Sequence, residues 1–391
     1  MKHILILTTT LSTGGITSFT IPLVKELAKT HDVTLAYTVD TCDKLKQIPE
    51  NVRKVSYRAG STKNTILYML IHGWLHHALK IKTRNHGSVS PIASIQRVAF
   101  ASAEVTRLPE ELLEEYDIAI STAEFYCNDL IVSKIKAKKK VGWIHPDYKA
   151  LHTDVTFDRR TLDALNLIVT VSESTRGSLL ELIPDYKQKV IYLPNKIEAG
   201  KIWELSEQYP PEYEKLQEKK IIVTVCRIDN SSKRVDRIIA IAKKMRERCE
   251  HFHWFIVGDG PDAQMIQALI DKMGLSEHIT MLGLRKNPYP YMRYADLFVL
   301  TSQYEGRPIV VDEAIALHCP VIVSEYRTAI EQVKIEYGYI IHNTDELIVE
   351  DFISKLNWEK IAKKKNYLIE NNVLAKTANE FNDKISLILE L

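Results

Sequence analysis

The sequence predicts an α/β protein built from two doubly wound parallel-sheet domains in tandem. Apolar strand-like runs alternate with helical patterns along the chain, as is typical of parallel sheets covered by helices on both faces. The chain has 391 residues, whereas one domain commonly holds about 100–200. The polar segment 196–219 contains Pro210-Pro211 and has no strand pattern, so we expect the domain boundary there.

The first half is expected to form strands that are short apolar runs, of a length suited to buried parallel strands. Between the second and third of them, residues 64–82 carry apolar side chains at helical spacing, which favours an amphipathic helix. The expected strands cover residues 3–9, 32–39, 116–122, 140–145, 165–172 and 189–195.

The second half repeats this alternation. Ligands of doubly wound sheets bind at the carboxyl ends of the strands, so the site is expected there, in a cleft between the two domains. The expected strands cover residues 220–227, 253–260, 278–283, 296–302, 320–325 and 337–342.

Composition favours a folded protein of a reducing compartment. Hydrophobic residues make up 45% of the chain, and the five cysteines have no CxxC or Cys/His spacing, which disfavours a disulfide framework and a zinc site. The amino terminus has the pattern of a first buried strand rather than of a signal peptide. No apolar run reaches the length of about 18 residues that a spanning helix needs, so we expect a cytoplasmic protein.

Positive charge is concentrated in one block, although the net charge is only +2. No acidic residue lies between Glu50 and Glu104. Together with the helical pattern of residues 64–82, this block favours association with an anionic membrane surface. The alternative is a core helix with a solvated basic flank. Aromatic residues do not interleave with these charges, so a nucleic-acid partner is not expected. The basic residues are Arg53, Lys54, Arg58, Lys63, Lys80, Lys82, Arg84 and Arg97.

Two glycine-containing loops follow expected strands. Gly14 and Gly15 precede a helix expected to begin near Ile16 or Thr17, where bare amides would face an anion. No GxGxxG fingerprint occurs in the chain, which disfavours a dinucleotide cofactor. The second loop, "IVGDGP" at residues 256–261, is interpreted as a plain tight turn.

Cationic residues also follow expected strands. Arg227 ends a strand of the second domain, and Lys233 lies six residues later, before a helix. Together they could bind a pyrophosphate, although a solvated loop with unrelated bases is the alternative. His145 ends a first-domain strand, where it could bind a sugar hydroxyl or have only a structural role.

The segment "TSQYEGRPIVVDEAIA" at residues 301–316 places two glutamates in an apolar stretch. Pro308 suits the first helical position, which would direct the amides of residues 306–309 toward an anion. Glu305 would lie at the mouth of the site. Glu313 would lie inside the helix on an apolar face and therefore needs a specific partner. The alternative is that Glu305 complements the helix dipole and Glu313 pairs with a structural arginine or with backbone.

These motifs resemble, in order and over nearly the whole chain, the retaining GT-B glycosyltransferases called glycosyl transferases group 1, family four. The resemblance rests on "EGRPIVVDE", on the spacing of Arg227 and Lys233, on "GGIT" after the first strand, on "GWIH", and on "VSESTRGSL" with "VIYLPNK". It implies a fold of two Rossmann-like domains. Residues 1–200 would bind the acceptor, residues 201–372 the nucleotide-sugar, and residues 373–391 would form a helix packing back toward the first domain.

The resemblance also implies roles for individual residues. The catalytic set would be Glu305, Arg227, Lys233 and His145, with Glu305 and His145 on the transferred sugar and the two cations on the diphosphate. Glu313 would bind the ribose, and the loop from Gly283 to Arg285 would lie against the base. The donor-binding set would be Gly14, Gly15, Gly283, Leu284, Gly306, Arg307, Pro308, Ile309, Val310 and Glu313.

Three positions depart from the family pattern. Arg307 stands where a small or apolar residue is common, which would place an extra cation in the sugar pocket. Arg234 and Lys196 stand where glycine is frequent. The implied reaction class does not depend on these positions, but the identity of the donor sugar does.

The resulting hypothesis is a retaining, metal-independent hexosyltransferase without a cofactor. It would move a sugar from a nucleotide-diphosphate sugar to a hydroxyl of a lipid-linked or polysaccharide acceptor at the inner membrane face, in the synthesis of a capsule, an exopolysaccharide or another cell-surface polysaccharide. A sugar-nucleotide epimerase or a phosphorylase of the same fold is an alternative, as is a non-catalytic GT-B partner subunit.

Overall fold

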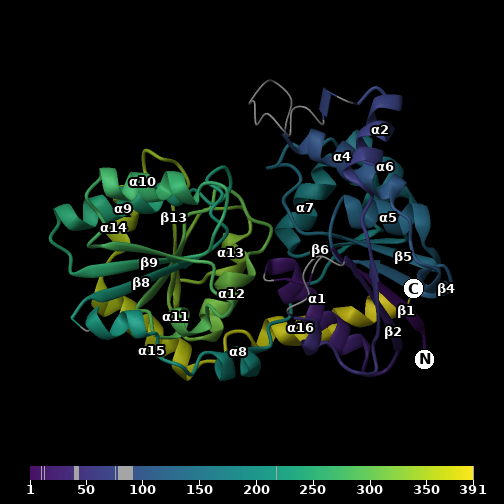
Figure 1. The fold of residues 1–391 in the computed structure, drawn as a ribbon. Coiled ribbons are helices and arrows are strands. Elements are labelled where there is room, and N and C mark those ends of the chain that lie inside the picture. The colour runs from purple at the N-terminus through teal and green to yellow at the C-terminus, as the bar shows by residue number, and fades with distance from the viewer. Residues whose placement is uncertain are drawn as a thin grey trace. The chain divides into compact units, whose positions relative to one another are not determined.

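The computed structural model describes residues 1–9, 11–12, 14–38, 44–74, 76–77, 91–216 and 218–390. The chain divides into two compact units (Figure 1). The first unit comprises Met1–Lys196 and Glu380–Leu391, and the second comprises Ile197–Asn379.

A parallel sheet forms the centre of the first unit, with strands in the order β3-β2-β1-β4-β5-β6-β7. The order reverses between β1 and β4, where Ile4 lies between Val33 of β2 and Ile118 of β4. The strands are β1 His3–Leu7, β2 Asp32–Thr38, β3 Arg53–Tyr57, β4 Glu115–Ser121, β5 Lys136–Ile144, β6 Leu167–Thr170 and β7 Val190–Tyr192.

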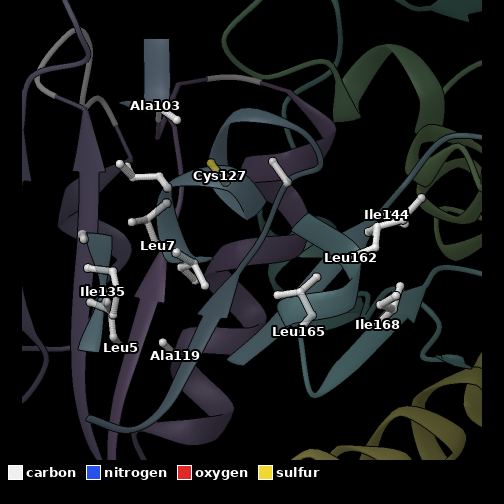
Figure 2. Packing of buried hydrophobic residues seen from close by; sticks show 14 of the residues in the cluster. Leu5, Leu7, Ala103, Ala119, Cys127, Ile135, Ile144, Leu162, Leu165 and Ile168 are labelled. Atoms are coloured by element: carbon white, nitrogen blue, oxygen red, sulfur yellow. The ribbon is translucent and has the colours of Figure 1, made fainter. Parts of the chain in front are cut away.

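Helices pack on this sheet and bury its apolar side chains. Figure 2 shows Leu5 of β1 and Ala119 of β4 in one cluster with Cys127 and Leu162, which come from helices. The helices are α1 Gly15–Leu27, α2 Thr62–Ile71, α4 Pro91–Val105, α5 Tyr126–Lys134, α6 Val155–Ala164 and α7 Glu173–Leu182, with 3₁₀ turns at Leu45–Gln47, Glu110–Leu112 and Pro184–Tyr186.

The second unit contains a parallel sheet in the order β10-β9-β8-β11-β12-β13, which reverses between β8 and β11. Its strands are β8 Lys220–Val225, β9 Phe252–Val257, β10 Ile279–Gly283, β11 Leu297–Leu300, β12 Val321–Ser324 and β13 Gly338–Ile341. Its helices are α8 Ala199–Leu205, α9 Val235–Glu247, α10 Ala263–Lys272, α11 Tyr289–Arg293, α12 Ile309–Ala316, α13 Ala329–Gln332, α14 Ile348–Lys355 and α15 Trp358–Glu370, with a 3₁₀ turn at Pro211–Leu216.

Both faces of this second sheet are buried. Successive residues of a strand point to opposite faces, and accordingly Ile222 joins one core cluster while Val223 joins the other. Covering both faces with helices is what makes parallel strands nearly continuous apolar runs. The predicted fold class of two doubly wound α/β units is thereby confirmed.

The expected strands all occur, but β3 was not predicted. Only Val55 and Tyr57 are buried in this edge strand, so it lacks the apolar run that marked the others. The helix expected over residues 64–82 ends at Ile71, because Gly73 at φ 71° turns the chain out of the helix. Leu75, Leu79 and the basic residues Lys80, Lys82 and Arg84 lie outside the described residues.

The carboxyl-terminal helix α16, Ala375–Leu389, begins in the second unit and continues into the first. Phe381, Ile385 and Ile388 are buried. Lys196 Nζ donates a hydrogen bond to Asn382 Oδ1 at 3.3 Å. Residues 380–390 are therefore part of the packed first unit. In the described part of the chain, no helix combines the length and the apolar character needed to cross a bilayer.

Candidate functional site

The candidate site of the second unit lies where the strand order reverses. Lys233 is in the loop after β8, and Glu305 is in the loop after β11. These two strands are neighbours, so their carboxyl ends bring the two loops to the same point of the sheet edge. This is the position at which open α/β sheets bind ligands.

Lys233 and Glu305 form an ion pair between Nζ and Oε1. Ser302 Oγ donates a second hydrogen bond to the same carboxylate oxygen at 2.7 Å. Burial alone lowers the pKa of Lys233, but the adjacent Glu305 carboxylate raises it more, so this pKa lies above the ordinary lysine value. The lysine is therefore a fixed cation held at the sheet edge. The side chains of Lys233 and Glu305 are 24% and 11% exposed, which leaves both accessible to a ligand.

Arg227 begins the loop that carries Lys233, and its side chain is exposed. Among the described residues, its guanidinium has no ion-pair or hydrogen-bond partner. An exposed guanidinium with all of its donors available can bind a phosphate through two parallel hydrogen bonds.

Glycines of the loop after β9 bring its backbone against the Arg227 loop. A Cβ on Gly258, at φ 145°, would lie 1.8 Å from the carbonyl oxygen of Cys226, and one on Gly260 would lie 2.3 Å from that of Ile228. Ile228 N donates to the Asp259 carbonyl at 3.0 Å. The interpretation of "IVGDGP" as a plain tight turn is therefore incomplete, because both glycines permit a close approach that shapes the cation-bearing loop.

Helix α12 follows Glu305. It begins at Ile309, and Pro308 is the residue before it, with an extended ψ of 113°. The expectation that Pro308 occupies the first helical position is therefore off by one residue, and its fixed φ instead directs the chain into the helix. Asp312 lies in the first turn, where a carboxylate complements the helix dipole.

Glu313 has the specific partner that its burial demanded. It is 5% exposed, and the hydroxyl of Tyr289 donates a hydrogen bond to its Oε1 at 2.9 Å. Burial, and then the charge of Glu313, raise the pKa of Tyr289 well above the ordinary tyrosine value. The tyrosine thus remains a proton donor that orients the carboxylate.

Arg307 points to Asp312. Its Nε and Nη2 donate to the two carboxylate oxygens at 3.1 and 3.2 Å, and the side chains are 8% and 1% exposed. Burial lowers the pKa of Arg307, but Asp312 raises it more, so the guanidinium stays charged. Its charge is thus matched within the same stretch of chain without a ligand.

The loop after β10 holds the residues expected against the base. Gly283 has φ 68°, and a Cβ there would meet nothing within 4 Å. Leu284 is 63% exposed. Arg285 pairs with Glu212 at 3.3 Å and is thereby held at the side of this loop.

The first-unit candidates follow β1 and β5. Helix α1 begins at Gly15, one residue earlier than expected, with Gly14 as its N-cap at φ 155°, and a Cβ on either glycine would meet nothing within 4 Å. His145 Nε2 lies 2.9 Å from the Thr122 carbonyl oxygen. A carbonyl oxygen only accepts, so Nε2 donates this hydrogen bond. This arrangement suits a sugar hydroxyl as well as a structural role.

Of the predicted residues, the structure brings Lys233 and Glu305 into direct contact, and Arg227 shares the loop of Lys233. Gly14, Gly15 and His145 belong to the first unit, and the remaining candidates to the second. Residues missed from the sequence are the partners Ser302, Tyr289 and Asp312. The sequence carried a signal only for Tyr289, because buried Glu313 needed a hydrogen-bond donor.

One family model and several known proteins match this chain. Residues 206–383 match the family model described as Glycosyl transferases group 1. The uncharacterized glycosyltransferase MJ1059 of Methanocaldococcus jannaschii is 24% identical over 210 residues, covering 51% of this chain and 51% of that protein. The alpha-monoglucosyldiacylglycerol synthase of Acholeplasma laidlawii is 24% identical over 306 residues, covering 75% of this chain and 72% of that protein.

Among solved structures, HepE of Anabaena in complex with UDP and glucose aligns with a TM-score of 0.68 at 13% identity, over 99% of this chain and 100% of that chain. The chain spans about half the length, or less, of the first curated relatives that it matches.

Two Rossmann-like parallel-sheet units in tandem, the second with charged residues at its strand-order reversal, define the GT-B class of fold, and the likeness to HepE confirms this prediction. Within that class, residues 206–383, most of which lie in the second unit, match the family model described as Glycosyl transferases group 1.

Proposed function

We propose that the protein is a retaining, metal-independent glycosyltransferase that moves a sugar from a nucleotide-diphosphate sugar to an acceptor hydroxyl. The observation that carries this proposal is the contact between Lys233 and Glu305 at the sheet edge. The bond that breaks joins the anomeric carbon of the sugar to a phosphate oxygen. The Lys233 cation suits the phosphate on one side of that bond. The Glu305 carboxylate suits a hydroxyl of the sugar on the other side.

In this mechanism the acceptor oxygen forms a bond to the anomeric carbon as the bond to the diphosphate breaks. The electron pair leaves on the diphosphate oxygen, and Lys233 and Arg227 stabilise the negative charge that develops there. The acceptor proton passes to the leaving phosphate. Glu305 is engaged by Lys233 and Ser302, which suits binding of a sugar hydroxyl better than nucleophilic attack and supports front-side substitution with retention.

The remaining donor contacts follow the same order along the unit. The Glu313 carboxylate, oriented by Tyr289, would accept hydrogen bonds from the ribose hydroxyls. The loop at Gly283 and Leu284 would lie against the base. HepE, which shares this fold, is in complex with UDP and glucose, so UDP-sugars are the first donors to test.

We further propose that the acceptor is lipid-linked and that helix α2 contacts an anionic membrane. The helix buries Thr65 and Met69 but exposes its larger apolar side chains, and Arg58 before the helix and Lys63 in its first turn are exposed. Apolar side chains flanked by cations can insert at the headgroup level of an anionic bilayer. The name of the Acholeplasma relative indicates synthesis of a glucosylated diacylglycerol. The exposed apolar residues are Ile66, Leu67, Leu70 and Ile71.

Catalysis is tested with Glu305→Gln and a panel of UDP-sugars, by measuring UDP release with and without a lipid-linked acceptor. We expect acceptor-dependent release by the wild type that EDTA does not abolish, a product anomer matching the donor, and about a 10²–10³-fold loss in the variant. Interconversion of sugars without acceptor would instead indicate an epimerase, and a requirement for inorganic phosphate would indicate a phosphorylase. Wild-type turnover in Glu305→Gln would refute the site.

Membrane contact is tested by co-sedimentation with phosphatidylglycerol vesicles. Leu67→Glu with Ile71→Glu should lower binding. The control is Ile335→Glu, at a position 67% exposed in the second unit, which should bind as the wild type does. Equal binding by all three proteins would refute the role of α2.

A further inference from the structure

Arg237 of α9 is a buried arginine whose guanidinium is fully used. It is 4% exposed, and an arginine side chain carries five N–H donors. Its nitrogens make hydrogen bonds to Asp345 Oδ1 at 2.8 Å, Thr301 O at 3.2 Å, Asn343 Oδ1 at 2.6 Å, Gln303 Oε1 at 2.8 Å and Asn343 O at 3.2 Å.

These acceptors lie in the loops after β11 and β13. The first loop contains Glu305, and it is joined to the Lys233 loop by further bonds. Gln303 N donates to Ser232 O at 2.8 Å, and Thr301 Oγ1 donates to Arg234 O at 2.9 Å. Residues 301–303 are therefore held between Arg237 on one side and the backbone of residues 232–234 on the other.

Arg234 adds to the same network from an unusual backbone position. It precedes α9 at φ 48°, in the left-handed region. Its Nη2 donates to both carboxylate oxygens of Asp345 at 2.8 Å. Asp345 thus connects Arg234, next to Lys233, to Arg237, which holds the loop that leads to Glu305.

We propose that Arg237 is a positioning residue that sets the contact between Lys233 and Glu305 without touching substrate. This inference rests on the proposed function of that pair. Displacement of a catalytic group by about 1 Å can lower the rate about a hundredfold. The Arg237 guanidinium holds the loop that leads to Glu305 directly, and it holds the Lys233 loop through residues 301–303 and Asp345, which restricts such displacement.

The test compares Arg237→Lys with Lys244→Met in the full chain. Lys244 is also on α9 and pairs with Glu350 at 3.0 Å, away from both loops. Lysine keeps the charge at position 237 but offers three donors instead of five. We expect Arg237→Lys to lower turnover about tenfold to a hundredfold and to reduce the preference for UDP over UMP, because Lys233 would meet the second phosphate less well. Lys244→Met should change neither quantity.

Asp345→Asn should have a smaller effect, since the other four bonds of Arg237 remain. Hydrogen exchange of residues 229–233 and 301–305 should quicken in Arg237→Lys and not in Lys244→Met. A folded Arg237→Lys protein with wild-type exchange in both loops, or with wild-type turnover and nucleotide preference, overturns the proposal. If the wild type binds neither UDP nor UMP, the proposed function fails, and the exchange measurement alone decides whether Arg237 positions the loops.

Discussion

Tyr289 and Glu313 are joined by a hydrogen bond between a half-buried phenol and a buried carboxylate, 24 residues apart in the chain and 2.9 Å apart in space. Glu313 lies on α12, the helix that follows the Glu305 loop. The hydrogen bond holds the two carboxylate oxygens in place as acceptors. The ribose part of the proposed donor site can therefore be tested separately, by substitutions at Tyr289 and Glu313.

Replacing Tyr289 by Phe removes the donor and leaves a buried carboxylate less satisfied. We expect the free energy of unfolding to fall by about 1–3 kcal/mol, measured by urea denaturation. Tyr294→Phe is the matched control, because the Tyr294 hydroxyl donates to the carbonyl of Glu207 at an exposed site.

In Glu313→Gln, the preference for UDP over 2′-deoxy-UDP should be smaller than in the wild type. An unchanged preference would remove Glu313 from the ribose site.

The buried pair of Arg307 and Asp312 predicts a second stability effect. Asp312→Asn removes the charge opposite a guanidinium that is 8% exposed, and breaking such a pair typically costs about 3–5 kcal/mol. The control is Glu204→Gln, which breaks a surface pair with Lys201 and should leave the denaturation midpoint unchanged. Equal midpoints for the two variants would contradict the structural role of Arg307.

Two glycines with positive φ predict opposite tolerances to alanine. In Gly258→Ala the new Cβ would overlap the carbonyl oxygen of Cys226, so we expect a loss of about 3 kcal/mol or more, since overpacking adds to backbone strain. In Gly283→Ala the space is open, and only left-handed strain of about 1–2 kcal/mol applies. Thermal unfolding of the two variants checks this order. A larger loss of stability in Gly283→Ala than in Gly258→Ala would contradict the predicted overlap at Gly258.

Asp129 predicts a pH dependence of the first unit. Burial raises its pKa to about 7, and the nearby Asp158 adds to this while Thr161 and Arg160 oppose it. Burial also raises the pKa of Asp158, to about 6. Unfolded aspartate has a pKa of about 3.9, so between these values the folded state binds more protons than the unfolded state.

Stability should therefore fall as the pH rises from about 4 to about 7. Asp129→Asn cannot ionise at this position and should therefore reduce this slope. The stability of the variant relative to the wild type should be higher at pH 8 than at pH 4. Urea midpoints across this range check it. A variant with the same slope as the wild type would mean that Asp129 does not titrate in this window.

The sequence was sufficient to predict the sheets and the loops that meet. Alternating apolar runs marked the buried strands, while β3 escaped because only Val55 and Tyr57 of it face the core. The charged residues Arg227, Lys233 and Glu305 marked the loops that follow two of these strands. That Lys233 and Glu305 touch depends on β8 lying beside β11, a strand order that no residue pattern states.

Side-chain partners were the part that sequence reasoning could not supply. Arg307 and Asp312 are five positions apart, outside the three- or four-residue spacing at which helical side chains are expected to meet. Arg234 is an instructive case. The sequence showed arginine where the resembling family often has glycine, and the structure gives the reason glycine suits that position, a φ of 48°. Here hydrogen bonds to Asp236 and Asp345 stabilise the arginine.

The first unit is closed by residues 380–391, and Lys196 and Asn382 lie in contact within it. While that unit stays folded, the second unit is a 183-residue insertion, from Ile197 to Asn379, whose ends are pinned together. Unfolding it then releases a closed loop rather than a free chain, and a closed loop gains less conformational entropy. Each doubling of such a loop changes this term by only about 0.6 kcal/mol, so insertions in surface loops of the second unit should alter its stability little, whereas removal of the last residues of α16 should release the constraint altogether.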